Sequence, residues 1–390
     1  MGTKARVTMH FGDGNTIDAW NQLNLHESFT DPLSSLTFEA APPRRFFADY
    51  RKRLAKGELV TVFINDANQG SFLIQTVDRT VSKAGGCMIK VNCNTVLVTP
   101  YQGHVNPDLA LRYTNGDVTI EEAILAALKP YGFVEIEVDE AANSAGKAGV
   151  KITSRKVGKR KLSDFKLNIA VAQENESAYQ FCTRIVTRLG AVLRVDARGK
   201  LLVCVPDYEQ APLYTVAQAF GKTFPREVDA FIGDVHIHDS NDGQFSQCTI
   251  RGQNQLDTTS TQRPDATILD SDIHPNRPCY SSFAANFKPK IIRDKNSRDV
   301  ARARSVATLE LGARAVDAFW VEGEVDGFVA GSGAIWTIDT MGTVIVEAEE
   351  LNEDLWLVER TMRQDVSGGQ RTQLKWLPPN ALQLGDLSTS

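Results

Sequence analysis

A stretch of alternating residues around a double glycine constrains the fold more than any other part of this sequence. LWLVERTMRQDVSGGQRTQLKW runs from residue 355 to 376 and turns at Gly368 and Gly369. Alternation with a period of two is typical of strands half-buried in a sheet, and glycine supplies the turn between them. The stretch predicts a long β-hairpin with one buried face and one face toward polar surroundings. Its apolar face is expected to contain Trp356, Val358, Met362, Thr372, Leu374 and Trp376.

The first hundred residues also indicate β structure. ARVTMHF, LVTVFIND, SFLIQTVD and CMIKVNCNTVLVTP are short runs rich in β-branched and aromatic residues, and GDGN, ANQG and KAGG supply turns. One segment differs, because PPRRFFADYRKRLAKGE places Phe46, Phe47, Tyr50 and Leu54 at nearly helical spacing and ends at Gly57. The pattern predicts an antiparallel barrel or sandwich with one short helix.

The middle of the chain changes to an α/β pattern. VTIEEAILAALKPYG predicts a helix whose first turn is closed by a capping box of Thr119 and Glu122. A second helix begins after Ser177, where Gln180 completes a second capping box. The strands AVLRV and KLLVCV flank the turn DARG and predict a tight hairpin. Together these elements predict a small unit with helices on one side of a sheet.

Strands return after residue 211, interrupted by one helix, SRDVARARSVATLELGARAVDAF. A chain of 390 residues is too long for one ordinary core, so two or three domains are expected. The predicted fold is mainly β with an α/β insert, and the second β domain is interrupted by a helical insertion. The expected ranges are 1–104 for the first β domain, 105–208 for the α/β domain, 209–262 with 319–390 for the second β domain, and 263–318 for the insertion.

Charge and hydropathy bear on possible partners. The net charge of −5 argues against a protein that coats nucleic acid. The strongest basic cluster, KITSRKVGKRKLSDFK at 151–166, has little aromatic content, so a solvated loop is favoured over a nucleic-acid contact and its role stays open. The sequence contains no signal-peptide pattern and no apolar run of the roughly 20 residues that cross a bilayer. We therefore expect a soluble chain, made in the cytoplasm, without a membrane-spanning segment.

The sequence offers no convincing catalytic, cofactor or metal site. His236 and His238 share one face of a strand but lack an evident third ligand, so a solvated strand edge is favoured over a metal site. Glu349 and Glu350 are neighbours on the chain, which does not suit the two facing carboxyls of a glycosidase. The motif GSG at 331–333 precedes a strand and is expected to be a turn. The cysteines are scattered without a close pair and are expected in the core, at Cys87, Cys93, Cys182, Cys204, Cys248 and Cys279.

Several segments resemble one family of phage proteins. SAYQFCTRIVTRLGAVLRVDARGKLLVCVPDY resembles a helix-plus-hairpin segment of the baseplate hub proteins of contractile-tailed phages, the Mu-type hub and late control D family. ESFTDPLSSLTFEAAPP resembles the first hairpin region of that family, and ARARSVATLELGARAVDAF with the strands after it resembles its C-terminal part. The resemblance covers nearly the whole chain in order of elements, and its motifs are loose.

This resemblance implies a structural virion protein of the tail baseplate and no enzymatic activity. Hub proteins of this kind are homotrimers in which each chain supplies two tube-like antiparallel β-barrel domains. The resulting pseudo-sixfold ring meets the hexameric tail tube protein on one side and the trimeric central spike protein on the other, among other baseplate proteins. DNA passes through its axial channel without specific binding. The candidate contact residues lie beside the first barrel, at Arg44, Arg45 and Arg51.

Two alternatives from other classes stay open. The first is a receptor- or carbohydrate-binding tail protein, which would need exposed aromatic side chains. Four tryptophans lie in the C-terminal β region, where a core position is the default, at Trp320, Trp336, Trp356 and Trp376. The second is a tail-associated cell-wall hydrolase, which would need facing carboxylates or a metal site.

Overall fold

The computed structural model describes most of the chain. The residues outside the description are 1–3, 19, 83–85, 107–109, 112–117, 139–165, 168–169, 174, 188–190, 219–227, 241–243, 253–264, 270–287, 295–299, 380 and 383–390. The predicted basic loop at 151–165, Cys279 and most of the polar stretch before the helical insertion fall in these ranges, so those predictions are not tested.

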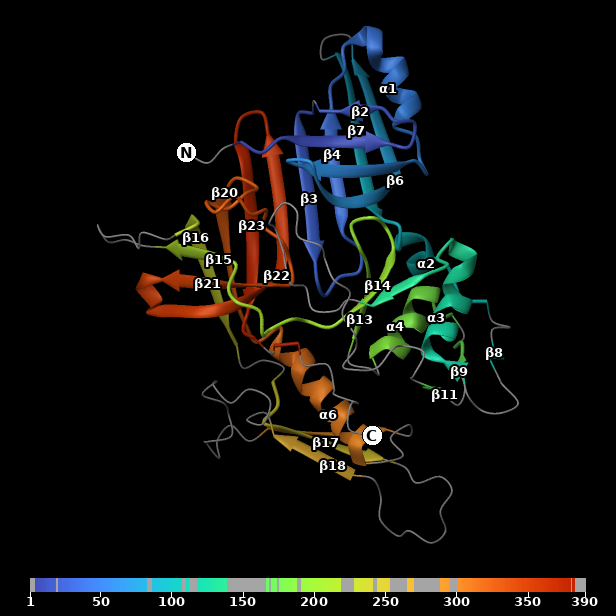
Figure 1. Ribbon diagram of the computed structural model, residues 1–390, viewed down its shortest axis with the longest axis vertical. Helices are drawn as coiled ribbons and strands as arrows, with labels where there is room; N and C mark the ends of the chain where they lie inside the picture. The colour runs from blue at the N-terminus through green and yellow to red at the C-terminus, as the bar shows by residue number, and fades with distance from the viewer. Residues whose placement is uncertain are drawn as a thin grey trace.

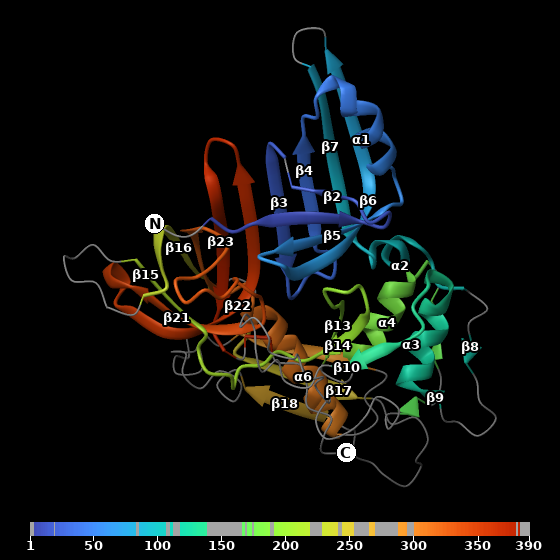
Figure 2. The same ribbon diagram turned by 45° about the horizontal axis from the view of Figure 1, so that its top comes forward.

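One continuous sheet of thirteen strands forms the body of the molecule and confirms that the chain is mainly β (Figures 1 and 2). Its strands alternate buried and exposed residues, which reflects the period-two patterns of the sequence. In sheet order the strands are β2 (Thr16–Ile17), β1 (Val7–Phe11), β5 (Leu59–Ile64), β6 (Ala67–Ser82), β7 (Gly86–Thr95), β4 (Ser35–Ala40), β3 (Gln22–Ser28), β22 (Leu351–Asp365), β21 (Thr340–Val346), β15 (Tyr214–Gln218), β16 (Ala230–Asp239), β20 (Phe319–Asp326) and β23 (Gly369–Leu377).

The C-terminal half of this sheet closes on itself. β22 pairs with β21 on one side and with β23 on the other, so β22, β21, β15, β16, β20 and β23 form a closed six-stranded barrel. The predicted hairpin is confirmed, with its turn at Gly369, where φ is +76°. The ladder is not entirely antiparallel as predicted, because β15 runs parallel to both β16 and β21.

The N-terminal half is a curved sheet whose ladder, in the part of the chain described, does not close into its own ring. β2 forms one edge, and β3 at the other end pairs with β22 of the closed barrel. Register shifts between Val62 and Phe63 and between Ile74 and Thr76 mark the irregularities that bend strands. The two predicted β domains are therefore joined edge to edge by the β3–β22 pair.

The hairpin differs from its prediction in which faces are buried. The register of β22 against β23 shifts between Leu357 and Glu359, so Val358 is an extra residue and the side-chain parity changes there. Met362 faces the barrel interior with Leu374 and Trp376, as expected. Trp356 and Val358 point to the opposite face, where they join a second apolar cluster. Both faces of β22 are thus buried near Trp356.

An α/β unit lies beside the sheet (Figure 1). Its sheet consists of β10 (Ile136–Val138), β14 (Leu201–Cys204) and β13 (Val192–Val195), and the predicted hairpin around Gly199 is confirmed. Its core lies between this sheet and α2 (Val98–Gln102), α3 (Ile120–Leu128) and α4 (Ala178–Val186). Two short ladders add β8 (Ala110–Leu111) with β12 (Ala170–Val171) and β9 (Val118–Thr119) with β11 (Lys166–Leu167).

A separate module is inserted between β16 and β20 of the barrel. β17 (Gln247–Gly252), β18 (Asp265–Leu269) and β19 (Pro289–Asp294) form a three-stranded sheet against α6 (Val300–Ala315). The sequence placed residues 247–252 in the barrel, which is wrong. Cys248 and Ile250 pack on Ala307 of the helix, so their burial comes from the insertion.

Both predicted capping boxes are present, and the first carries a testable charge effect. The Thr119 backbone N–H donates to Glu122, its hydroxyl donates to the same carboxylate, and both bonds lower the pKa of Glu122. We expect Thr119→Ala to destabilise α3 by about 1 kcal/mol. NMR titration should show the pKa of Glu122 rising but staying below its ordinary value, because the backbone bond remains.

The sign of the pH effect follows from the lowered pKa. The stabilisation by Glu122 is complete above its unfolded pKa and is lost as the pH falls through the lower folded pKa. Ser177→Ala removes the matching box of α4, where the partner Gln180 does not titrate, and serves as the control. If the stability lost by Thr119→Ala and the stability lost by Ser177→Ala changed equally with pH, the pH effect would not come from the Glu122 carboxylate.

Candidate functional site

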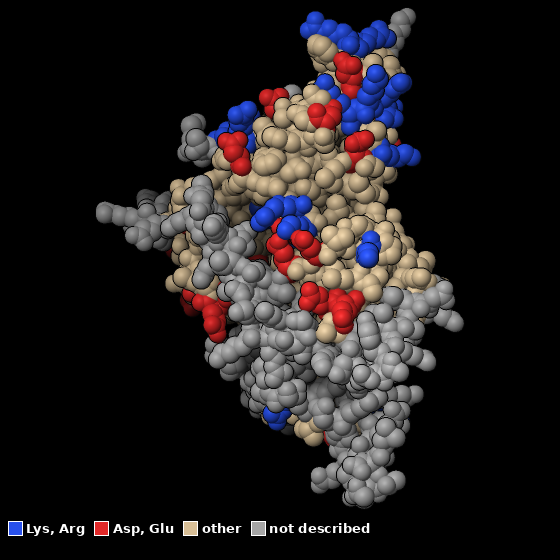
Figure 3. All heavy atoms as spheres, turned by 45° about the vertical axis from the view of Figure 1, so that its right-hand side comes forward, with Lys and Arg blue, Asp and Glu red and all other residues tan. Residues whose placement is uncertain are grey.

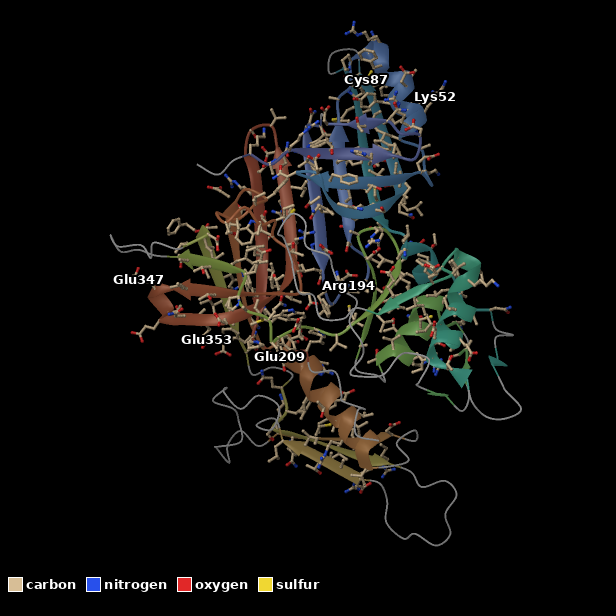
Figure 4. All side chains as sticks on the ribbon, viewed as in Figure 1. Lys52, Cys87, Arg194, Glu209, Glu347 and Glu353 are labelled. Carbon is tan, nitrogen blue, oxygen red and sulfur yellow. The ribbon has the colours of Figure 1, made fainter. Side chains whose placement is uncertain are left out.

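Three parts of the molecule meet at one carboxylate. Glu27 on β3 accepts hydrogen bonds from Arg360 on β22, with the Glu27 Oε2 to Arg360 Nη2 distance at 2.7 Å. Its other oxygen lies 3.2 Å from Nη2 of Arg194, which comes from β13 of the α/β unit. The three side chains therefore connect the N-terminal sheet, the closed barrel and the α/β unit. Figure 4 shows Arg194 at the centre of the molecule, where these parts converge.

Burial makes this junction stronger than a surface ion pair. The side chain of Arg360 is only 3% exposed, and those of Arg194 and Glu27 are 11% and 21% exposed. Arg360 also donates to the backbone carbonyl of Trp336, and the guanidinium of Arg194 lies 4.9 Å from the ring centroid of Phe29. The two cations are thus satisfied by one carboxylate, a carbonyl and an aromatic ring, as buried charges require.

Further contacts fasten the two β halves along their shared edge. Nδ1 of His26 on β3 lies 3.0 Å from the hydroxyl of Thr361 on β22. Gln370 on β23 both accepts from the backbone N–H of Ala5 and donates to its carbonyl, which fixes the segment leading into β1 against the barrel. Contacts at both ends of the interface restrict rotation of one half against the other.

A buried polar network fixes the outer face of the barrel. Asp339, at φ +62°, accepts from the indole N–H of Trp356 and from the backbone N–H of Asp207. Trp356 stacks edge-on against Phe29 and Tyr208, with centroid distances of 5.0 and 5.3 Å. The segment that leaves the α/β unit is therefore bound to the barrel wall.

The predicted histidine pair lies against an aromatic ring. His236 and His238 are both on β16, and their rings lie 4.7 and 5.2 Å from Trp320. Nζ of Lys375 lies 4.9 Å from the same ring. In the residues described, no group of three or more His, Cys, Asp or Glu side chains could hold a metal ion.

The other predicted motifs also have structural roles. GSG at 331–333 forms the expected turn, in which the backbone N–H of Ser332 donates to Asp229. Glu349 and Glu350 lie exposed in a short turn. Five of the six cysteines are buried, at Cys87, Cys93, Cys182, Cys204 and Cys248. Burial raises the pKa of Cys93 to about 12, which opposes formation of a reactive thiolate.

The candidate contact residues lie together on the surface at one end of the molecule. Arg44 and Arg45 are in η1 (Arg44–Phe46), Arg51 is in α1 (Phe47–Arg53), and all three are exposed. Figure 3 shows Lys and Arg side chains gathered at this end. Their role as contacts remains a prediction.

The junction residues were not predicted from the sequence. Glu27, Arg194 and Arg360 lie more than 160 positions apart, and each resembles an ordinary polar residue of a strand. One signal was available for Arg360, which follows the apolar run Leu355–Val358 in a strand whose other charged residues lie toward its ends or next to Arg360. Such a position indicates a buried ion pair when both faces of the strand are covered.

Comparison of the whole structure with solved structures identifies tail proteins with the same fold. No protein-family model matches the sequence, and no curated protein matches it. The tail protein from Neisseria meningitidis has a TM-score of 0.70 at 16% identity, over 97% of this chain and 98% of that one. The 43 kDa tail protein of prophage MuSo2 from Shewanella oneidensis has a TM-score of 0.68 at 15% identity, over 97% and 99%.

A more distant likeness extends to a secretion complex. A chain of the Francisella PdpA–VgrG complex has a TM-score of 0.56 at 11% identity and matches 98% of this chain but 59% of its own length. At these identities the agreement establishes the fold. The chain therefore has the β-rich fold of phage tail proteins along nearly its whole length. Among the described helices, none is long and apolar enough to span a bilayer.

Proposed function

We propose that this chain is a structural protein of a phage tail baseplate, the homotrimeric hub that joins the tail tube to the central spike. The observation that carries the proposal is agreement in fold with two tail proteins over 97% of this chain and nearly all of theirs. A match of that extent includes both β halves and the α/β unit. The location that follows is the virion, with the chain made in the host cytoplasm.

The arrangement of the sheet suits a protein that joins a sixfold assembly to a threefold one. Each chain supplies two β units side by side, joined by the β3–β22 pair. Three chains arranged in a ring would present six β units, which could face a hexameric tube, while the trimer itself matches a trimeric spike. On this proposal the domain ranges 1–104 and 209–262 with 319–390 contain the two tube-like units, except that residues 247–252 belong to the insertion.

The buried junction supports the same role. A ring that transmits force between tube and spike needs fixed angles between its units. Glu27 holds cations from the barrel and from the α/β unit at once, so a change in either angle would separate a buried charge from its partner. We infer that the junction keeps each protomer rigid within the ring.

The alternative functions receive less support. A glycan-binding surface would need clustered exposed aromatic rings, but of the four tryptophans in the C-terminal β region Trp336, Trp356 and Trp376 are fully buried and Trp320 is partly buried. A hydrolase would need facing carboxylates, and Glu349 and Glu350 lie in one exposed turn. We therefore propose no enzymatic activity, no cofactor and no metal, and propose that other baseplate proteins bind the outside of the ring.

DNA is proposed to pass through the ring without specific binding. The net charge of −5 would limit attraction of the channel wall for a polyanion, because like charges repel. A reconstruction of the assembled ring would test this point, and a strongly basic wall would contradict it.

The oligomeric state is the decisive first test. We expect gel filtration with light scattering to give about three times the 42.9 kDa mass of the chain, or, after mixing with the spike protein of the same tail, that mass plus the mass of the bound spike. A ring in electron micrographs of that species would support the hub. A monomer that binds neither spike nor tube protein would contradict the proposal.

A further inference from the structure

The segment from Arg44 to Lys56 carries a concentrated positive charge. It contains six Lys or Arg residues and one Asp, and it includes η1 and α1. We call it the basic segment. Its fully exposed cations are Arg44, Arg45, Arg51, Lys52 and Lys56.

The body of the protein holds the basic segment in place. Leu54 is completely buried in the main core, and Phe47 and Tyr50 pack against that core. Arg79 on β6 donates to the carbonyl of Leu54 at the end of the helix. The segment therefore presents its cations from an anchored helix, which lowers the entropy cost of binding an anionic surface.

An equally concentrated negative charge lies in the turn between β21 and β22. Residues 347–354 contain five acids and no Lys or Arg, and they include η7 (Glu347–Glu349). We call it the acidic turn. The pairing of Val346 with Leu351 fixes its base, and Thr343 donates to Asp354 at 2.6 Å. Its exposed acids are Glu347, Glu349, Glu350, Glu353 and Asp354.

The two charged surfaces lie on different sides of the molecule. Figure 4 labels Lys52 on one side of the structure and Glu347 and Glu353 on the other, and the two sheet halves lie between them. The surfaces cannot neutralise each other within one chain. They can meet between two copies, and the pair would then retain one free acidic turn and one free basic segment, on different copies, for the next contacts.

We propose that the basic segment binds the acidic turn of a neighbouring copy of this chain. This inference rests on the proposed ring. A contact between two different surfaces of the same chain gives a closed assembly only when successive rotations from copy to copy return to the first copy. Net charges of +5 and −5, counted from the two segments, make the surfaces complementary. Such complementarity selects the register of neighbours and accelerates their association.

The test uses charge reversal on each side separately and then together. Arg51→Glu with Lys52→Glu reverses the basic segment, and Glu349→Lys with Glu353→Lys reverses the acidic turn. We expect either pair to weaken self-association in sedimentation velocity at low salt by about tenfold or more. The fourfold variant restores opposite signs and should recover most of the lost association. Arg6→Glu with Lys129→Glu changes the same net charge at exposed sites elsewhere and should leave association unchanged.

The outcomes separate this contact from the hub proposal. Trimers that form equally well in all variants would overturn the contact and leave the hub proposal standing. A wild-type chain that stays monomeric up to the highest soluble concentration would also overturn it, and binding to tube and spike would then test the hub. If reversal of the basic segment abolishes binding of duplex DNA and leaves self-association unchanged, the partner is nucleic acid and the inference is wrong.

Discussion

Glu27→Gln should lower the free energy of unfolding by about 3 kcal/mol, although it preserves the size of the side chain. The substitution removes the one negative charge that faces Arg360 and Arg194. Loss of one partner leaves a buried cation uncompensated, which typically costs roughly 3–5 kcal/mol. We place the effect at the lower limit because Glu27 is 21% exposed. Urea unfolding followed by tryptophan fluorescence measures the change.

The region that opens first in the Glu27→Gln variant distinguishes local loss of the junction from a general loss of stability. Hydrogen exchange should accelerate first along the β3–β22 pair and at β13, where the three parts meet. Glu359→Gln is the matched control on the same strand, because its carboxylate makes only a 3.8 Å contact with His26. Its cost should stay below about 1 kcal/mol. Equal losses in the two variants would show that the junction charge is not specifically important.

Local sequence patterns predicted the individual elements well. The terminal hairpin, the two capping boxes and the Gly199 hairpin depend on residues within a few positions of each other, so the sequence contains the whole physical cause. The helical spacing of α6 predicted an inward stripe of Val300, Ala303, Ala307, Leu311 and Ala315; Ala303, Ala307 and Leu311 are buried, whereas Val300 at the start of the helix is 53% exposed.

Predictions failed where distant segments decide the outcome. Cys248 and Ile250 alternate as any half-buried strand would, and their pattern does not say whether the barrel or α6 covers them. The extra residue at Val358 reverses the face of Trp356, and nothing in the alternation marks that register shift. The ion pairs of Glu27 connect positions 167 and 333 residues away, so only the folded sheet reveals them. The candidate site was therefore the least predictable part of the molecule.

Trp376→Ala should be at least as destabilising as the loss of the junction charge. The Trp376 side chain is completely buried inside the closed barrel, beside Leu374 and Met362. Removing a buried aromatic ring leaves a cavity and costs about 3–5 kcal/mol. If the alanine variant does not fold, Trp376→Leu should show the same direction with a smaller loss. Thermal and urea unfolding both measure the effect.

A glycine on β21, one strand beyond the neighbour of β23, makes the role of the Trp376 ring specific. A Cβ atom added at Gly342 would lie 2.7 Å from the Trp376 ring and 3.3 Å from the carbonyl oxygen of Tyr214. We therefore expect Gly342→Ala to cost about 1–3 kcal/mol by overpacking. In the Trp376→Leu background the same change should cost clearly less, because the ring that it meets is gone. Gly233→Ala is the control within the barrel, since a Cβ there would meet nothing within 4 Å. If the two substitutions at positions 342 and 376 changed the free energy of unfolding in a strictly additive way, the Trp376 ring would not pack against Gly342 inside the barrel.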